Sequence, residues 1–405
     1  MRVLHLTAEF PPHIWGGLGT AVGGLATASA RAGLDVKVLL VAGDWFWSYG
    51  HRAETPESLQ RAMVADSRLE ILPARETDAV AAAVRLAGQW RPDVLHVHPV
   101  ELWPIARGIR EQTGIPIVYT VHSLNCAEYE IGNEPPEILG LWRDQQELIA
   151  GADRVLALTR DERDLLLRSC PHVADRVRVL GNGIDGIDER AEAGPARRGA
   201  GRRDLTVLFA GRFVERKGIR ELFAAIPPIL EKAPATRFVL VGGHGTGAAV
   251  EVGLPPELER WRDRIHFTGW LSPSEVAAQY QSADIQVIPS WYEPFGMVVL
   301  EGMLHGLALV ASDLGGPAEI LEHGRTGLLV PPRDAAALAS AVLSLLEDAK
   351  LRRRLAAAAA AEVRRRWLWP RIVERMRDVY LEAVIERELP QASRLTSPMR
   401  WTAFA

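Results

Sequence analysis

Only two of the 405 residues are cysteines, which excludes a fold held together by disulfide bonds. Cys126 and Cys170 do not form a CxxC motif, so a structural zinc site or a dithiol redox centre is not indicated either. No apolar run reaches the ~20 residues that span a bilayer, and the N-terminus carries no signal-peptide pattern. We therefore expect a soluble protein of a reducing compartment, the cytoplasm, and leave peripheral contact with a membrane surface open.

The chain also has no excess of positive charge. Its 47 lysines and arginines stand against 51 acidic residues, a net charge of −4, which argues against a nucleic-acid partner bound through bulk charge. Hydrophobic residues make up 48% and charged residues 24%, as in ordinary globular proteins, so disorder is excluded. A chain of 405 residues is long enough for two or three domains of ~150 residues.

Short apolar segments alternate with helical segments along most of the chain. Residues 3–7 and 36–41 predict strands on either side of a helix, and this unit recurs before residue 188. A polar stretch rich in Gly, Pro and Arg at 188–204 predicts a linker, after which the alternation restarts. The pattern predicts an α/β protein with two doubly wound parallel-sheet domains facing a cleft, at 1–190 and 203–368.

A glycine loop opens the first predicted helix. Gly17, Leu18 and Gly19 lie where backbone N–H groups and the helix dipole favour an anion such as phosphate, although a plain tight turn explains the glycines equally well. The dinucleotide fingerprint GxGxxG is absent, which argues against a nicotinamide-dependent dehydrogenase.

Three histidines end two predicted strands of the first domain. His122 ends the segment YTVH, where a cleft position and a plain structural role are equally plausible. For the segment HVH we expect His96 and His98 to point to opposite sides of their strand, a poor geometry for a shared metal ion. One of these two is expected to be a core or supporting residue.

Charged residues follow two predicted strands of the second domain. Arg212 and Lys217 suit a diphosphate, with solvated surface charge as the alternative. Glu293 lies in a loop, and Glu301 lies in the helix that starts near Gly296. The two carboxylates suit either a glycosidase acid and nucleophile or the binding of sugar and ribose hydroxyls. No DxD motif occurs, so a metal-bridged diphosphate is not indicated.

These motifs together resemble the family 4 retaining glycosyltransferases. The spacing E-x7-E in EPFGMVVLE, the loop GGLG, the histidine of YTVH, GRFVERKG and GGPAEI occur in the order of that family, from residue 1 to about 385. The opening TAEFPPHIWGGLG is more similar to the glycogen and starch synthase branch, except that Ile14, Trp15 and Thr20 replace residues typical of it. The resemblance implies the GT-B architecture, with a C-terminal helix at about 370–388 crossing back to the first domain.

The resemblance also implies roles for individual residues. The catalytic set would be His122, Arg212, Lys217 and Glu293, with both cations stabilising the departing nucleotide and His122 near the reacting sugar carbon. Glu301 would bind the ribose, and Glu293 the transferred sugar. The donor-binding set would be Gly17, Leu18, Gly19, Arg212, Lys217, Glu293, Phe295, Gly296, Met297, Val298 and Glu301.

The implied reaction is transfer of a glucose-like hexosyl unit from a nucleotide-diphosphate sugar to a hydroxyl acceptor, with retention and without a metal or other cofactor. A GT-B epimerase or hydrolase and a non-catalytic nucleotide-sugar-binding protein remain the alternatives. The acceptor, small molecule or saccharide, is not identified by the sequence. An aromatic platform for it is expected among Trp15, Trp45, Phe46, Trp47 and Trp103.

Overall fold

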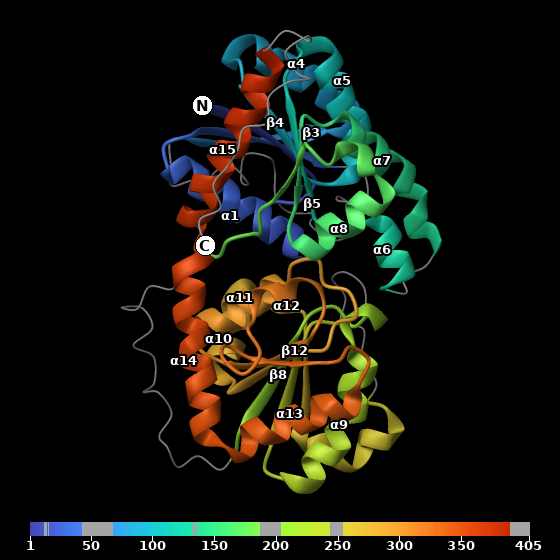
Figure 1. Ribbon diagram of the computed structural model, residues 1–405, viewed down its shortest axis with the longest axis vertical. Helices are drawn as coiled ribbons and strands as arrows, with labels where there is room; N and C mark the ends of the chain where they lie inside the picture. The colour runs from blue at the N-terminus through green and yellow to red at the C-terminus, as the bar shows by residue number, and fades with distance from the viewer. Residues whose placement is uncertain are drawn as a thin grey trace.

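The computed structural model describes residues 1–11, 14, 16–42, 68–132, 136–186, 204–243 and 254–388. Two parallel sheets with helices on both faces lie one above the other in Figure 1, which confirms the predicted α/β architecture of two Rossmann-like domains. Residues 188–203 of the linker predicted at 188–204 lie outside the described residues, as do Trp15, Trp45, Phe46 and Trp47 of the predicted platform.

The first domain is built on a seven-stranded sheet in the order β3-β2-β1-β4-β5-β6-β7. Its strands are β1 Arg2–Thr7, β2 Asp35–Ala42, β3 Leu69–Arg75, β4 Val94–Val97, β5 Ile117–Val121, β6 Arg154–Ala157 and β7 Val177–Val179. Every residue of β4, β5 and β6 is buried, as expected for central parallel strands covered on both faces. The helices are α1 Gly17–Arg31, α4 Ala79–Trp90, α5 Trp103–Thr113, α6 Asn125–Glu130, α7 Trp142–Gly151 and α8 Arg160–Ser169, with 3-10 turns at Glu76–Asp78, Val100–Leu102, Pro136–Leu141 and Pro171–Val173.

The second domain is built on a six-stranded parallel sheet in the order β10-β9-β8-β11-β12-β13. Its strands are β8 Thr206–Ala210, β9 Arg237–Val241, β10 Ile265–Gly269, β11 Ile285–Ile288, β12 Ala308–Ser312 and β13 Leu328–Val330. Its helices are α9 Ile219–Lys232, α10 Pro273–Ser282, α11 Met297–Leu304, α12 Gly315–Ile320, α13 Ala335–Glu347 and α14 Ala349–Arg366, with 3-10 turns at Glu215–Lys217 and Pro256–Arg264.

The last helix, α15 (Trp369–Glu388), returns from the second domain to the first, as predicted (Figure 1). It packs against α1 and against β4, β5 and β6. The segment between α14 and α15 lies beside Ile184, which follows the last strand of the first domain. The Ile184 N–H donates to the Trp367 carbonyl (2.8 Å), and the Trp369 N–H donates to the Ile184 carbonyl (3.1 Å). The end of the first domain and the start of the returning helix are therefore joined by backbone hydrogen bonds at one place.

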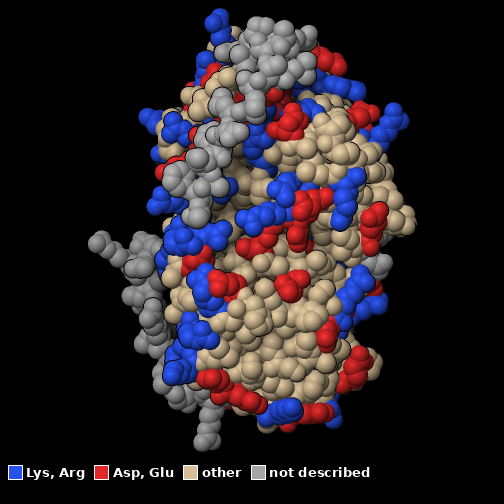
Figure 2. All heavy atoms as spheres, viewed as in Figure 1, with Lys and Arg blue, Asp and Glu red and all other residues tan. Residues whose placement is uncertain are grey.

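Charges of both signs are interspersed over the face shown in Figure 2. A line of basic side chains follows the edge of the lower domain, where Figure 1 places the arginine-rich α14. Among the described residues, no helix is both long enough and apolar enough to cross a membrane.

The crossing of α15 over α1 depends on a glycine. A Cβ added at Gly24 would lie 2.2 to 2.6 Å from three indole atoms of Trp369. We predict that Gly24→Ala lowers the free energy of unfolding by about 1–3 kcal/mol, because overpacking at this contact outweighs the gain in helix propensity. Gly88→Ala in α4 is the matched control, since a Cβ there meets nothing within 4 Å. Chemical denaturation measures both variants, and equal stabilisation of the two would contradict this account of the crossing.

Candidate active site

The predicted site residues lie in loops and in the first turns of the helices that follow strands of both sheets, at the carboxyl ends where open parallel sheets bind ligands. His122 follows β5 of the first domain, and Glu293 follows β11 of the second. The glycine loop of the first domain approaches α11 of the second, because a Cβ at Gly17 would lie 3.7 Å from Met297 Cγ. The structure thus brings Gly17 and Met297 together from sequence positions 280 residues apart.

Helix α11 begins at a glycine that its conformation requires. Gly296 caps the helix with a φ of 92°, a region that L side chains rarely adopt. The first N–H groups of a helix have no partner inside it, so the backbone at Met297 and Val298 suits an anion. The Phe295 side chain is not free to contact a ligand, since it is buried edge-on against Trp367 with ring centroids 5.5 Å apart. The contact predicted for Phe295 is made by its backbone amide, so the burial of its side chain does not affect that prediction.

Lys217 and Glu293 form a largely buried ion pair within the second domain. The Ser290 hydroxyl donates to the same carboxylate at 3.4 Å. Burial opposes ionisation of Glu293, but the charges of Lys217 and Arg216 outweigh it and lower the pKa of the carboxyl group. Arg212 is exposed. Burial lowers the pKa of the Lys217 amine, Glu293 opposes this effect, and the charges of Arg216 and Arg212 add to it. The predicted cation pair therefore consists of one exposed guanidinium and one amine held by a carboxylate.

Glu301 lies in a different environment from Glu293. The Tyr280 hydroxyl donates to its carboxylate at 2.7 Å, and burial raises the pKa of Glu301 above its usual value. Gln286 supports this arrangement by donating to Tyr280 Oη (3.4 Å) and to the Val298 carbonyl (3.0 Å). The two glutamates of the E-x7-E motif are thus held by separate partners.

Tyr292, which precedes Glu293, joins the two domains and was not found from the sequence. Its hydroxyl donates to the Glu162 carboxylate, with both oxygens at 3.0 Å, and accepts from the Leu124 N–H at 3.1 Å. Ser123, the neighbour of His122, also donates to Tyr292 Oη at 3.4 Å. The neighbours of Glu293 and His122, Tyr292 and Ser123, therefore meet at this contact between the domains.

A second junction missed by the sequence reasoning joins Arg216 to Glu128. The Arg216 Nη2 atom lies 3.5 Å from Glu128 Oε1, and both side chains are mostly buried. Arg216 lies between the two predicted cations in GRFVERKG, so the motif itself was the available signal. Glu162 had no such signal, because its helix segment RDERDLLLR has the charge pattern of a solvated helix.

His122 belongs to a buried histidine cluster of the first domain. Its Nε2 lies 3.1 Å from His98 Nδ1, and His98 Nε2 lies 2.9 Å from His5 Nδ1. The prediction that His96 and His98 point to opposite sides of their strand was wrong: their rings stack with centroids 4.2 Å apart. Successive strand residues alternate, so two residues separated by one lie on the same face.

The cluster does not make an obvious metal site. One nitrogen from each of His5, His96 and His98 lies within 4.8 Å of the others, in the part of the chain that the structure describes. Hydrogen bonds already engage both ring nitrogens of His96, to Tyr380 Oη (2.8 Å) and Thr120 Oγ1 (2.7 Å). Both nitrogens of His98 are also engaged. A metal ion would have to replace several of these bonds.

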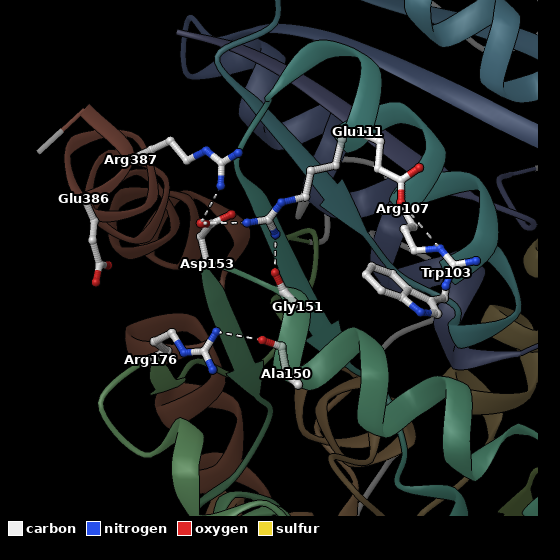
Figure 3. A pocket seen from close by; sticks show the side chains of 10 residues that line it. Trp103, Arg107, Glu111, Ala150, Gly151, Asp153, Arg176, Glu386 and Arg387 are labelled. Carbon is white, nitrogen blue, oxygen red and sulfur yellow. Dashed lines mark hydrogen bonds and ion pairs between the residues drawn. The ribbon is translucent and has the colours of Figure 1, made fainter. Parts of the chain in front are cut away.

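A pocket of about 630 Å³ lies elsewhere on the first domain, bordered by α5, the end of α7, the start of β6 and the end of α15 (Figure 3). Its arginines are held by protein groups: Arg110 donates to the Gly151 carbonyl, and Arg176 donates to the Ala150 carbonyl at 3.0 Å. Trp103, predicted as part of an aromatic platform, is buried and donates to Glu147 Oε2 at 3.3 Å. None of the predicted donor-binding residues lines this pocket, so it is separate from the candidate site.

Two family descriptions match the chain. Residues 15–186 match "Glycosyltransferase Family 4", and residues 204–348 match "Glycosyl transferases group 1". A glycogen synthase from Mycobacterium tuberculosis is 30% identical over an alignment of 417 positions that covers 96% of this chain and 97% of that protein. An alpha-maltose-1-phosphate synthase from Mycolicibacterium smegmatis is 31% identical, with coverage of 94% and 99%.

The fold is also similar to solved structures. Anabaena Alr3699/HepE, in complex with UDP and glucose, superposes with a TM-score of 0.71 at 21% identity, covering 93% of this chain and 98% of that chain. This likeness supports the two-domain architecture.

The buried Glu162 predicts a pH-dependent stability. Burial raises its pKa to about 8 despite the hydrogen bond from Tyr292, and the charges of Glu128 and Asp161 act in the same direction as burial. The unfolded chain releases this proton near 4.5 while the folded chain keeps it to about 8. The stability that Glu162 contributes is therefore complete below pH 4.5 and lost as pH rises through 8.

We predict that Glu162→Gln removes this loss, so that the variant gains stability relative to the wild type between pH 5 and pH 8. Thermal denaturation across this pH window measures the difference. The control is Glu76→Gln, at an exposed glutamate, which should leave the curve unchanged. Parallel curves for wild type and Glu162→Gln would contradict a proton held by Glu162.

Proposed function

The chain belongs to the family 4 glycosyltransferases, and on this premise we propose that it is a retaining hexosyltransferase that uses a nucleotide-diphosphate sugar. The transferred unit is glucose-like, the acceptor is a hydroxyl group, and no metal ion takes part. The observation that carries the proposal is that Gly17 of the first domain approaches Met297 at the start of α11, while the Lys217–Glu293 pair lies beside the same helix start, where a Cβ at Gly296 would lie 3.2 Å from Glu293 Cγ.

The donor diphosphate would lie against Arg212, Lys217 and the first N–H groups of α11. Negative charge grows on this diphosphate as the sugar leaves, and preorganised cations in a partly buried site stabilise it without reorganisation. The ion pair with Glu293 holds the Lys217 amine in place before the donor binds. An arriving diphosphate would then compete with Glu293 for this amine. Two fixed cations supply the charge that a divalent metal supplies in other transferases, which supports a metal-independent reaction.

The two glutamates would bind hydroxyl groups. Glu301, oriented by Tyr280, accepts from the ribose of the nucleotide, and Glu293 accepts from the transferred sugar. The first domain would supply His122 near the reacting carbon and the first turn of α1, Gly17–Gly19, over the phosphate. The acceptor hydroxyl would attack from the face on which the nucleotide leaves, which retains the anomeric configuration.

A glucose-like donor is supported by the relatives. The similar structure of Alr3699/HepE contains UDP and glucose, and two relatives are named for glycogen and for alpha-maltose-1-phosphate. The different names of these two relatives leave the acceptor of this chain open, and the proposal stops at a hydroxyl group.

The proposal is tested by incubating the protein with UDP- and ADP-hexoses, with and without saccharide and polyol acceptors, and following the sugar by mass spectrometry and NMR. We expect transfer with retained α-configuration, undiminished in excess EDTA. A changed sugar without transfer would indicate an epimerase, free sugar a hydrolase, and binding without turnover a non-catalytic protein. Metal-reversible loss of transfer would contradict the metal-independent phosphate site.

The pair of glutamates gives a sharper prediction. We expect Glu301→Gln to weaken nucleotide binding by about tenfold to a hundredfold, because it removes a charged hydrogen-bond acceptor for the ribose worth about 1.5–3 kcal/mol. We expect Glu293→Gln to reduce transfer on the order of 10²–10³-fold. Its nucleotide affinity should be nearly unchanged, since the proposed partner of Glu293 is the transferred sugar and not the nucleotide. Calorimetric titration with the nucleoside diphosphate and initial rates separate the two effects.

The same experiment addresses the glycosidase alternative. In a glycosidase the two carboxylates are an acid and a nucleophile, so both substitutions would abolish hydrolysis and leave nucleotide binding unaffected. The wild type would then also hydrolyse simple glycosides. Nucleotide affinity that is equally insensitive to the two substitutions would contradict the ribose contact of Glu301.

A further inference from the structure

Three histidines from three adjacent strands form a hydrogen-bonded chain that ends at the candidate site. His5 lies on β1, His98 directly after β4 and His122 directly after β5, and β4 pairs with both of the other strands. His5 Nδ1 lies 2.9 Å from His98 Nε2, and His98 Nδ1 lies 3.1 Å from His122 Nε2. His5 and His98 are fully or almost fully buried, whereas His122 remains partly exposed.

All three rings are neutral near pH 7. Burial lowers the pKa of His5 to about 3 and of His122 to about 4, and it lowers the pKa of His98 well below the usual value, helped by the neighbouring histidines. Each neutral ring carries one N–H and one bare nitrogen. Because His98 is engaged at both nitrogens, it must donate to one neighbour and accept from the other.

The environment of His5, at the buried end of the three histidines, determines the direction in which the hydrogen bonds are donated. His5 Nε2 is buried and has no hydrogen-bond partner among the described residues. If His98 donated to His5, the only proton of His5 would sit on this Nε2 as a buried, unsatisfied N–H. If His5 instead donates from Nδ1, only a bare acceptor is left there. Orphaned buried N–H groups are rarer than unsatisfied acceptors, so the proton of His5 lies on Nδ1.

The direction of this first hydrogen bond then determines the direction of the next one, between His98 and His122. His98 accepts at Nε2 and therefore donates from Nδ1 to His122 Nε2. His122 accepts at Nε2 and therefore carries its proton on Nδ1. This Nδ1 atom has no protein partner in the described part of the chain, and it is not among the buried polar atoms without a partner, so it stays accessible.

We propose that His5 and His98 are positioning residues that hold His122 as its Nδ1–H tautomer, so that His122 presents a hydrogen-bond donor at its accessible nitrogen. The catalytic meaning of this tautomer rests on the proposed function. An Nδ1–H donates to an oxygen of the donor sugar, and it does not remove a proton from the acceptor hydroxyl. His122 would thus orient the sugar and would not be the general base.

The tautomer is measured directly in the wild-type protein. Long-range ¹⁵N–¹H correlation spectra of protein labelled at its 11 histidines distinguish a protonated from a bare ring nitrogen. The His122 signals are assigned by their loss in His122→Asn. We expect a protonated Nδ1 and a bare Nε2 in His122 at neutral pH. A protonated Nε2 in His122 would overturn the proposal without any variant of His5 or His98.

The variant His98→Leu removes the donor to His122. We expect His122 to become a mixture of tautomers and kcat to fall by about half or more, with KM for the donor little changed, because only one tautomer donates. His96→Leu is the matched control: His96 is equally buried and lies two residues before His98, but its ring nitrogens bond Tyr380 and Thr120. It should lower stability and leave the His122 tautomer unchanged.

The outcomes separate this inference from the proposed function. An Nδ1–H signature in a protein that transfers no sugar would support the histidine chain and contradict the transferase. Transfer together with an Nε2–H signature in His122 would support the transferase and contradict the proposed direction of the histidine hydrogen bonds. An unchanged tautomer in a folded His98→Leu variant would show that His98 does not set it.

Discussion

The arrangement of the site depends on one buried hydroxyl group. Tyr292 belongs to the second domain, yet it is only 4% exposed and packs in the apolar core of the first. There its hydroxyl lies between the Glu162 carboxyl group and the Leu124 N–H. Because Tyr292 is adjacent to Glu293, and this contact includes the neighbour of His122, the spacing between the two halves of the site is set here. Opening of the domains would have to break these buried bonds.

Burial also explains how the second domain keeps charged groups at the site. Desolvating an isolated amine or carboxylate costs several kcal/mol, and the loss is offset only when the two charges are paired. Lys217 and Glu293 meet this condition by pairing with each other. Glu301 meets it differently, through a hydrogen bond from Tyr280 and a raised pKa. The motif thus holds two carboxylates of unequal proton affinity within one loop and one helix.

Local patterns in the sequence were sufficient for the fold and for the motif residues. Parallel strands bring all their carboxyl ends to one edge, so residues after strands, such as His122 and Glu293, could be assigned to that edge without knowing their contacts. Partners between domains could not be found in this way. Glu162 lies in a segment whose charges match an exposed helix, and only the approach of Tyr292 makes it buried. The position of Trp103 was likewise decided by packing and not by its type.

The histidines show that the support of the site extends to the far end of the chain. His96 stacks on His98, and Tyr380 of α15 holds His96 through its hydroxyl. Helix α15 follows α14 of the second domain, so the chain leaves one half of the site and returns to support the other. Tyr380 of α15 thus helps to pack the cluster that contains His122, even though α15 carries none of the predicted site residues. The crossing helix therefore does more than join the two domains covalently, because it also contributes a buried hydroxyl group to the interior of the first domain beside the site.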